Sequence, residues 1–179
     1  MDQVQKEQTA AIIYTSGTIS APKPVMLSHG NIMYNACHAQ ALVETGTKAY
    51  TCLPLYHAYS LVCGALNVLT QGQHLGLNGR VKNWMRDLRL FSPEMILLVP
   101  MMMESLIRSI RLEQTRDGMR EEAKKALKRY ESRKRYHLSC SPFTHRAMTR
   151  VLGDSLFLII CGGAQLNERL AREFRCYGI

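Results

Sequence analysis

The residues best suited to chemistry lie in one stretch near the amino terminus, from residue 14 to residue 24. It combines hydroxyl side chains with a flexible glycine and a lysine, namely Thr15, Ser16, Thr18, Gly17 and Lys23. Hydroxyl and main-chain N–H groups donate to phosphate oxygens, and lysine supplies positive charge. The stretch can therefore hold a polyphosphate, although sequences of this composition are more often plain turns.

The same stretch differs from the phosphate loop of P-loop nucleotide hydrolases. Pro22 stands where that motif has the glycine before its lysine, and Pro24 stands where it has serine or threonine. Any phosphate binding here must therefore use another loop geometry.

The elements that must position this stretch alternate along the chain. Apolar, β-branched runs predict strands over residues 9–15, 25–27, 49–55, 74–77, 95–99 and 156–161. Helical patterns occupy residues 29–44, 60–69, 81–90, 102–112, 119–136 and 168–176, with Ser28 and Asn167 as helix caps. The alternation predicts an α/β fold with a mostly parallel sheet flanked by helices on both faces. Residues 9–15 are predicted to be a buried strand, and the hydroxyl-rich stretch a loop between two strands.

Length and composition fit one globular domain. The chain has 179 residues, of which 46% are hydrophobic and 21% charged, which excludes a disordered or fibrous class. The longest apolar run, residues 95–103, is much shorter than the roughly 20 residues of a membrane span. The amino terminus lacks a charged start followed by an apolar stretch, so a cytoplasmic location is expected.

Positive charge is concentrated in one segment. Residues 108–150 contain thirteen basic and five acidic residues, which accounts for +8 of the net charge of +9. A solvated helical face explains such a segment, and so does a peripheral contact with an anionic membrane or a protein partner. Nucleic-acid binding is not expected, because aromatic stacking residues are not arranged on a strand face.

Several segments resemble one enzyme superfamily. Residues 14–24 (YTSGTISAPKP) are similar to the signature Ser/Thr-Ser-Gly-Thr-Thr-Gly-x-Pro-Lys-Gly of the adenylate-forming acyl-CoA synthetases, adenylation domains and luciferases. The continuation VMLSHGNI follows at 25–32, and LPLYHAY at 53–59, LVP at 98–100 and CGGAQL at 161–166 come in the expected order. These matches span nearly the whole chain.

The resemblance implies part of the N-terminal large domain of an AMP-forming acyl-CoA synthetase. Residues 1–179 would be a partial AMP-binding domain with a helical insertion at about 101–153, without the small C-terminal domain. The implied reaction forms an acyl-adenylate from ATP and a carboxylic acid and then transfers the acyl group to coenzyme A, with Mg²⁺ held outside this chain. The insertion looks most like bacterial long-chain fatty acid–CoA ligases, and an aryl-CoA ligase or a peptide-synthetase adenylation domain is the alternative.

The resemblance also implies roles for individual residues. The phosphate loop would use Thr15, Ser16, Gly17, Thr18 and Lys23; His57 would be catalytic beside the acyl-adenylate; and main chain at Gly162, Gly163 and Ala164 would face adenine and the acyl group. The phosphate stretch would lie at the end of a central strand, beside a crevice at the two glycines. A surface lysine, a packed histidine and a glycine turn from strand to helix are the structural alternatives.

Three residues depart from the signature. Ile19 and Ser20 replace Thr-Gly, and Pro24 replaces the closing glycine. Ile19 lacks a hydroxyl donor and Pro24 lacks an N–H, so reduced phosphate affinity is expected. The chain is expected to be inactive alone and to form a homo-oligomer through exposed sheet edges.

Overall fold

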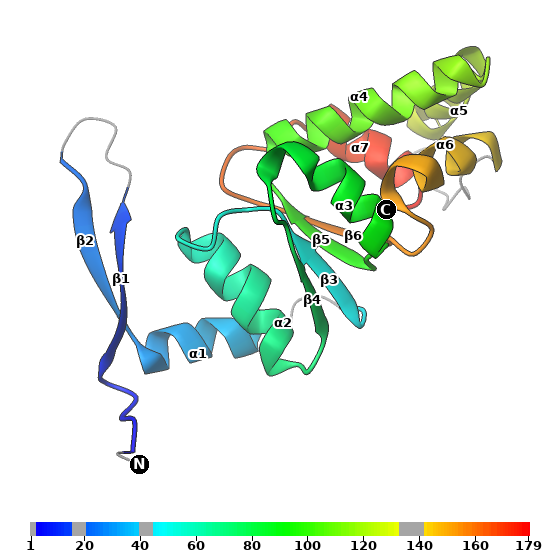
Figure 1. The fold of residues 1–179 in the computed structure, drawn as a ribbon. Coiled ribbons are helices and arrows are strands. Elements are labelled where there is room, and N and C mark those ends of the chain that lie inside the picture. The colour runs from blue at the N-terminus through cyan, green and yellow to red at the C-terminus, as the bar shows by residue number, and fades with distance from the viewer. Residues whose placement is uncertain (1–2, 16–20, 40–44, 133–141) are drawn as a thin grey trace.

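A four-stranded parallel sheet forms the centre of the molecule. The computed structural model describes residues 3–15, 21–39, 45–132 and 142–179. The sheet has the order β4-β3-β5-β6 and consists of β3 (Lys48–Thr51), β4 (His74–Leu77), β5 (Met95–Leu98) and β6 (Leu158–Cys161). Leu98 lies opposite Cys161, so the carboxyl ends of these strands share one edge. The predicted parallel sheet is confirmed (Figure 1).

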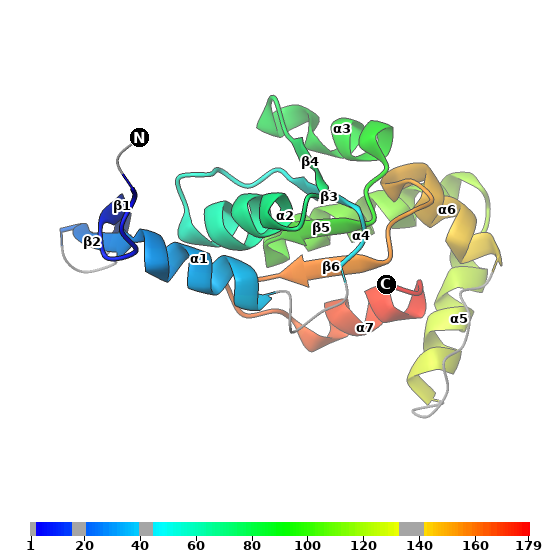
Figure 2. The ribbon, with the colours of Figure 1, turned by 90° about the horizontal axis from the view of Figure 1, so that it is seen from below.

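Helices cover both faces of this sheet, as predicted (Figure 2). One face carries the π-helix η2 (Tyr59–Leu66) and α2 (Asn67–Thr70), which pack on Ala49 and Leu97. The larger core lies on the other face, where Tyr50 and Ile96 meet helices α3 (Trp84–Phe91), α4 (Pro100–Arg116), α6 (Pro142–Leu152) and α7 (Glu168–Cys176). Successive strand residues point to opposite faces, so each strand supplies both cores.

A two-stranded hairpin stands apart from the sheet (Figures 1 and 2). Strand β1 (Thr9–Thr15) pairs with β2 (Lys23–Ser28) in antiparallel register. The prediction of a buried central strand is wrong here, because Ile12 and Tyr14 are 55% and 64% exposed. Only one face of the hairpin packs on the rest of the described chain, through Ala11 and Leu27. An apolar run alone does not show how many of its faces are covered.

Helix α1 (His29–His38) joins the hairpin to the sheet. Its predicted cap is confirmed, because the Ser28 hydroxyl accepts from the Asn31 N–H and the Asn31 side chain accepts from the Ser28 N–H. Ala36 packs against Val62 of η2, and the Asn67 amide donates to the Ala36 carbonyl at 2.6 Å. Residues 40–44 of the predicted helix lie outside the described residues.

Several predicted boundaries differ from the observed ones. Strand β3 ends at Thr51 and not at residue 55, because the chain turns at Pro54. A 3-10 turn, η3 (Val81–Asn83), precedes α3, and α4 extends beyond its predicted end to Arg116. Helix α6 was not predicted as a separate element.

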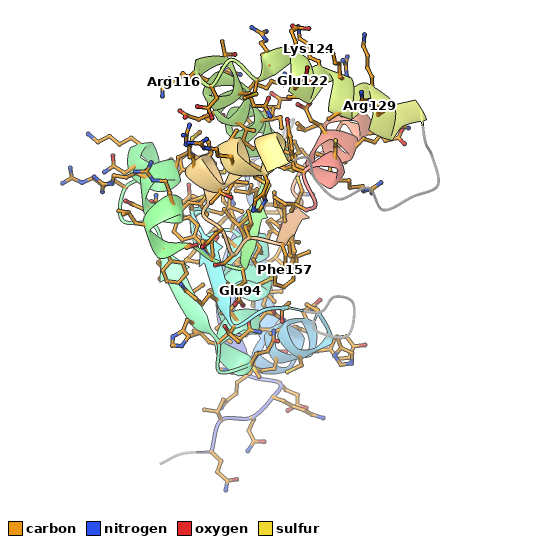
Figure 3. The ribbon with its side chains drawn as sticks, turned by 90° about the vertical axis from the view of Figure 1, so that its right-hand side faces the viewer. Glu94, Arg116, Glu122, Lys124, Arg129 and Phe157 are labelled. Carbon is orange, nitrogen blue, oxygen red and sulfur yellow. The ribbon has the colours of Figure 1, made fainter. Side chains whose placement is uncertain are left out.

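The basic segment contains α5 (Arg120–Ser132), which matches the predicted exposed helix. Figure 3 shows labelled side chains of α4 and α5 pointing outward, at Arg116, Glu122, Lys124 and Arg129. Lys124 pairs with Glu121 at 2.6 Å and Lys125 with Glu122 at 3.0 Å, so part of the positive charge is neutralised locally. Among the helices described, none is both long and apolar enough to cross a membrane.

Candidate functional site

The first part of the site is the turn that carries His57, just beyond the carboxyl end of β3. The Pro54 carbonyl accepts from the His57 N–H at 3.2 Å, and the buried Ser60 hydroxyl lies within hydrogen-bond distance of the carbonyls of both Pro54 and His57. The His57 side chain is exposed, and its ring lies 4.5 Å from the Tyr56 ring between centroids. The fold therefore presents His57 to solvent on a hydrogen-bonded backbone.

The second part is the turn after β6. The Gly162 N–H donates to the Leu98 carbonyl at 3.1 Å, which continues the sheet by one bond. Gly163 has φ of +81°, a left-handed conformation that favours glycine. Gly163 and Ala164 are exposed, and their N–H groups have no acceptor among the residues that the structure describes. The turn thus offers main-chain donors at the carboxyl edge, where ligands of parallel sheets bind.

Tyr59 links these two turns. Its hydroxyl donates to the Ile160 carbonyl of β6 at 3.1 Å, and its ring lies 2.9 Å from the position that a Cβ on Gly162 would take. Burial is the largest cause of a raised Tyr59 pKa, so the hydroxyl stays protonated and able to donate at neutral pH. Any side chain at position 162 would collide with the Tyr59 ring.

The sequence interpretation missed this link. The available signal was an aromatic residue two positions after His57 and a glycine at the end of a later strand. Neither feature indicates that the two residues touch until the strand order is known.

The phosphate stretch lies at the far end of the hairpin. Thr15 and Lys23 are paired across β1 and β2, and the Thr15 hydroxyl donates to the Lys23 carbonyl at 3.4 Å. Both residues are exposed, while Ser16, Gly17 and Thr18 lie outside the described residues. Figures 1 and 2 show the hairpin separated from the sheet, on the side toward which β6 runs. Tyr59 thus holds the turn that carries His57 beside the Gly162 turn. Among the described residues, no hydrogen bond or ion pair joins Thr15 or Lys23 to either turn.

The described residues provide no evident metal site. No group of three or more histidine, cysteine, aspartate or glutamate side chains that could hold a metal ion occurs among them. The carboxylates of Glu94 and Glu173 accept hydrogen bonds from Thr47 and Arg111, respectively. The part of the chain that the structure covers therefore does not fit a magnesium site made by the protein alone.

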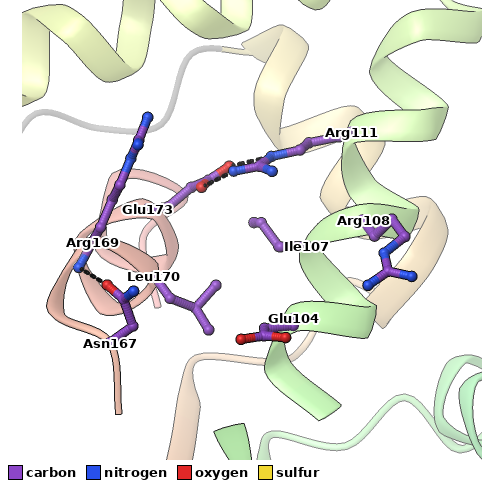
Figure 4. A pocket seen from close by; sticks show the side chains of 8 residues that line it. All are labelled: Glu104, Ile107, Arg108, Arg111, Asn167, Arg169, Leu170 and Glu173. Carbon is purple, nitrogen blue, oxygen red and sulfur yellow. Dashed lines mark hydrogen bonds and ion pairs between the residues drawn. The ribbon is translucent and has the colours of Figure 1, made fainter. Parts of the chain in front are cut away.

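A groove of about 410 Å³ lies between α4 and α7 (Figure 4). Its lining is mostly charged and comprises Glu104, Ile107, Arg108, Arg111, Asn167, Arg169, Leu170 and Glu173. Arg111 binds the buried Glu173 carboxylate through two hydrogen bonds of 2.9 and 2.5 Å, which stabilises the contact between the helices. None of its lining residues is among the site residues that the sequence predicted.

Comparison with known proteins identifies the family. A family model described as AMP-binding enzyme matches residues 1–179. The chain belongs to the AMP-binding enzyme family. This confirms the resemblance drawn from the ordered motifs.

Two curated relatives illustrate how much of an AMP-binding enzyme this chain covers. It is 33% identical over 116 residues to AEE15, a chloroplastic long-chain-fatty-acid–acyl-carrier-protein ligase of Arabidopsis thaliana, covering 60% of this chain and 15% of the relative. It is 40% identical over 72 residues to the acyl-CoA ligase AKT1 of Alternaria alternata, covering 38% of this chain and 12% of the relative. The chain thus spans only a small part of the relatives it matches.

Solved structures confirm the fold of this AMP-binding chain. A malonyl-CoA ligase with methylmalonyl-CoA and AMP bound superposes with a TM-score of 0.69 at 19% identity, over 100% of this chain and 33% of that one. An A-PCP didomain of carboxylic acid reductase from Segniliparus rugosus, in complex with AMP, gives 0.70 at 18% identity, over 97% and 22%. At these identities the likeness concerns the fold alone.

Proposed function

We propose that this chain forms part of the nucleotide-facing domain of an AMP-forming acid–thiol ligase. The observation that carries the proposal is the carboxyl edge of the sheet, where Tyr59 holds the His57 turn beside the Gly162–Gly163 turn. Main-chain donors and an exposed imidazole at the end of parallel strands form a suitable place for a nucleotide joined to an acyl group. Membership of the AMP-binding family supports the same assignment.

The proposed reaction has two steps. The carboxylate of an acid attacks the α-phosphate of ATP, and pyrophosphate leaves to give an acyl-adenylate. The thiol of coenzyme A then attacks the acyl carbonyl and AMP leaves. In this chain, the N–H groups of Gly163 and Ala164 would donate to the ligand, and His57 would lie against the acyl-adenylate.

Magnesium would accompany ATP and offset charge on its phosphates. A related structure, O-succinylbenzoate CoA synthetase of Bacillus subtilis, is in complex with ATP and a magnesium ion. The described residues lack a group that could hold a metal. As the resemblance implies, we propose that the protein ligands of the metal lie in a part of the enzyme outside this chain.

The hairpin end would hold the phosphates in the longer protein, through Thr15, Ser16, Gly17, Thr18 and Lys23. The departures Ile19, Ser20 and Pro24 remove or strain donors in that loop and would weaken the contact. In this structure the hairpin is separated from the sheet (Figure 1), and no hydrogen bond among the described residues joins Thr15 or Lys23 to the carboxyl edge. We therefore expect the chain alone to form no thioester.

A long-chain fatty acid is the proposed substrate. Support comes from the names of two relatives, AEE15 and the human long-chain fatty acid transport protein 5, which is 42% identical over 67 residues. Aryl and amino acids are the rivals, and one related structure is that of VinN with L-aspartate. Residues 1–179 would be a partial AMP-binding domain, and α4 to α6 would correspond to the insertion at about 101–153.

Two other proposals have less support. Local ion pairs reduce the charge that α5 could offer to an anionic membrane or a protein partner. The expected homo-oligomer would form through exposed sheet edges, such as those of the hairpin, which also exposes Ile12, Tyr14 and Met26. A monomer at high concentration in light scattering would contradict that proposal.

Calorimetry with ATP and magnesium tests the proposed function. We expect weak binding, with a dissociation constant of about 1 mM, because only one part of the site is formed. Lys23→Ala should leave that constant within about twofold. Gly163→Val should abolish the heat of binding, because a valine side chain would obstruct the turn and would be strained at the positive φ of this position. A flat response of the unmodified chain would contradict the proposal, and thioester formation by the 179 residues would contradict their expected inactivity.

A further inference from the structure

Ser60 is a buried polar residue next to the turn that carries His57. It lies three residues after His57, near the start of η2, and is 0% exposed. Its hydroxyl lies within hydrogen-bond distance of two carbonyl oxygens, of Pro54 and, at 3.1 Å, of His57. A serine has one hydroxyl hydrogen, so it donates to one of them at a time or shares the hydrogen between them.

Both carbonyls already have main-chain donors. The His57 N–H donates to Pro54, and the Leu61 N–H donates to His57 at 3.0 Å. The Ser60 hydroxyl is therefore not required to satisfy a buried acceptor. It adds a connection between the two ends of the turn, and this connection restricts how the turn can move.

The His57 imidazole depends on that backbone for its position. Among the described residues, its side chain makes no hydrogen bond or ion pair, and its recorded ring contact is with Tyr56 of the same turn. Where the imidazole stands relative to Gly162 is consequently set by the turn and by the Tyr59 contact next to it. A π-helix is rare and is frequently found at functional sites, and η2 begins at this point.

We propose that Ser60 is a positioning residue for His57, which fixes the imidazole beside the ligand at the carboxyl edge of the sheet. The ligand class is an acyl-adenylate, and in this respect the inference rests on the proposed function. Ser60 acts through the Pro54–His57 turn and does not itself touch the ligand.

Nuclear magnetic resonance of the chain and of Ser60→Ala tests this role. The alanine variant should show at least tenfold faster hydrogen exchange at the His57 and Leu61 amides, because the turn opens more often. The ring protons of His57 should also move toward their free-histidine positions, since they lose the fixed neighbourhood of the Tyr56 ring. Ser60→Cys, which retains a weak donor, should give intermediate values.

The matched control is Ser109→Ala in α4. The Ser109 hydroxyl donates to the Ser105 carbonyl at 3.1 Å, far from the turn in sequence, so its loss should leave the His57 signals unchanged. Unchanged His57 exchange and ring shifts in Ser60→Ala would overturn the positioning role. Should Ser60→Ala fail to fold, Ser60→Cys decides by the same two signals.

A titration with a ligand mimic tests the role of Ser60 separately from the proposed function. A decanoyl sulfamoyladenosine, a stable mimic of an acyl-adenylate, should shift the His57 ring signals of the unmodified chain. The shift should be at least threefold smaller in Ser60→Ala and unchanged in Ser109→Ala. A mimic without effect on the unmodified chain would overturn the proposed function, while the exchange measurement would still decide the role of Ser60.

Discussion

The hairpin and the carboxyl edge of the sheet carry different parts of the candidate site, and the fold holds them differently. At the carboxyl edge, Tyr59 joins the turn after β3 to β6 through a side-chain hydrogen bond, and the Ser60 hydroxyl bonds to the backbone of that same turn. At the hairpin, the pair Thr15 and Lys23 is exposed, and α1 connects the strands to the rest of the described chain. A recognisable motif therefore predicts which residues belong to a site, but the surrounding packing decides whether they are assembled.

The largest expected contrast comes from one residue type in both regions. Ile96 of β5 is 0% exposed and Ile12 of β1 is 55% exposed. Ile96→Ala should lower the free energy of unfolding by about 2–5 kcal/mol, because it removes buried methyl groups and leaves a cavity. Ile12→Ala should cost less than about 1 kcal/mol. Urea denaturation measures both, and equal losses would show that the hairpin is packed as tightly as the sheet.

Adding a methyl group should destabilise the protein at a packed glycine of the carboxyl edge and not at an open one. Gly162→Ala places a Cβ 2.9 Å from the Tyr59 ring, whereas Gly79→Ala meets nothing within 4 Å. We expect a loss of about 1–3 kcal/mol in the free energy of unfolding for the first and none for the second. The loss should shrink in a Tyr59→Ala background, and a double-mutant cycle without coupling would contradict the contact.

The hydrogen bond from Asn67 to α1, which connects the hairpin side of the molecule to the sheet, should contribute less to stability. Asn67→Ala removes the donor to the Ala36 carbonyl, whereas Asn35→Ala removes an exposed bond within α1. The first should lower the free energy of unfolding by about 1 kcal/mol and increase amide exchange in α1 more than in β5. An equal increase of exchange in both elements would show that this bond does not specifically hold α1 to the rest of the described chain.

The smallest effect concerns pH at the opposite edge of the sheet. Hydrogen bonding from the Thr47 N–H is the largest cause of a lowered Glu94 pKa. A carboxyl whose folded pKa is lowered stabilises the fold above its ordinary value of 4.5, and this stabilisation is lost as the pH falls through the folded value.

Acid should therefore loosen the start of β3 while leaving the hairpin unaffected. The measurement is amide exchange in both elements between about pH 5 and pH 3. Glu94→Gln should remove the pH dependence at β3. A hairpin that loosens in parallel with β3 would contradict the separation of the two regions.

Much of the fold was predictable because its signals are local. Apolar runs between turn residues predicted the four parallel strands, and Ser28 and Asn167 predicted helix starts through capping. The exposure of β1 was not predictable, because periodicity shows that residues are apolar but not what covers them. Whether a face is covered depends on contacts distant in sequence.

The candidate site was predictable to a similar extent. Motif order indicated His57, Gly162 and Gly163, and the structure brings their turns together. Tyr59 and Ser60 were not singled out, because a tyrosine and a serine in an apolar helix carry no signal of their own. Their contacts depend on the strand order, in which β6 lies two strands from β3, and on the winding of η2 as a π-helix. Neither can be seen from the two residues themselves.

The most direct test of the account is a map of amide chemical shifts during titration of the 179-residue chain with AMP. The account predicts shifts at Gly163, Ala164 and the His57 turn, and no shifts at Thr15 or Lys23 at the end of the hairpin. Shifts confined to the hairpin or to the groove between α4 and α7, with a silent carboxyl edge, would contradict it.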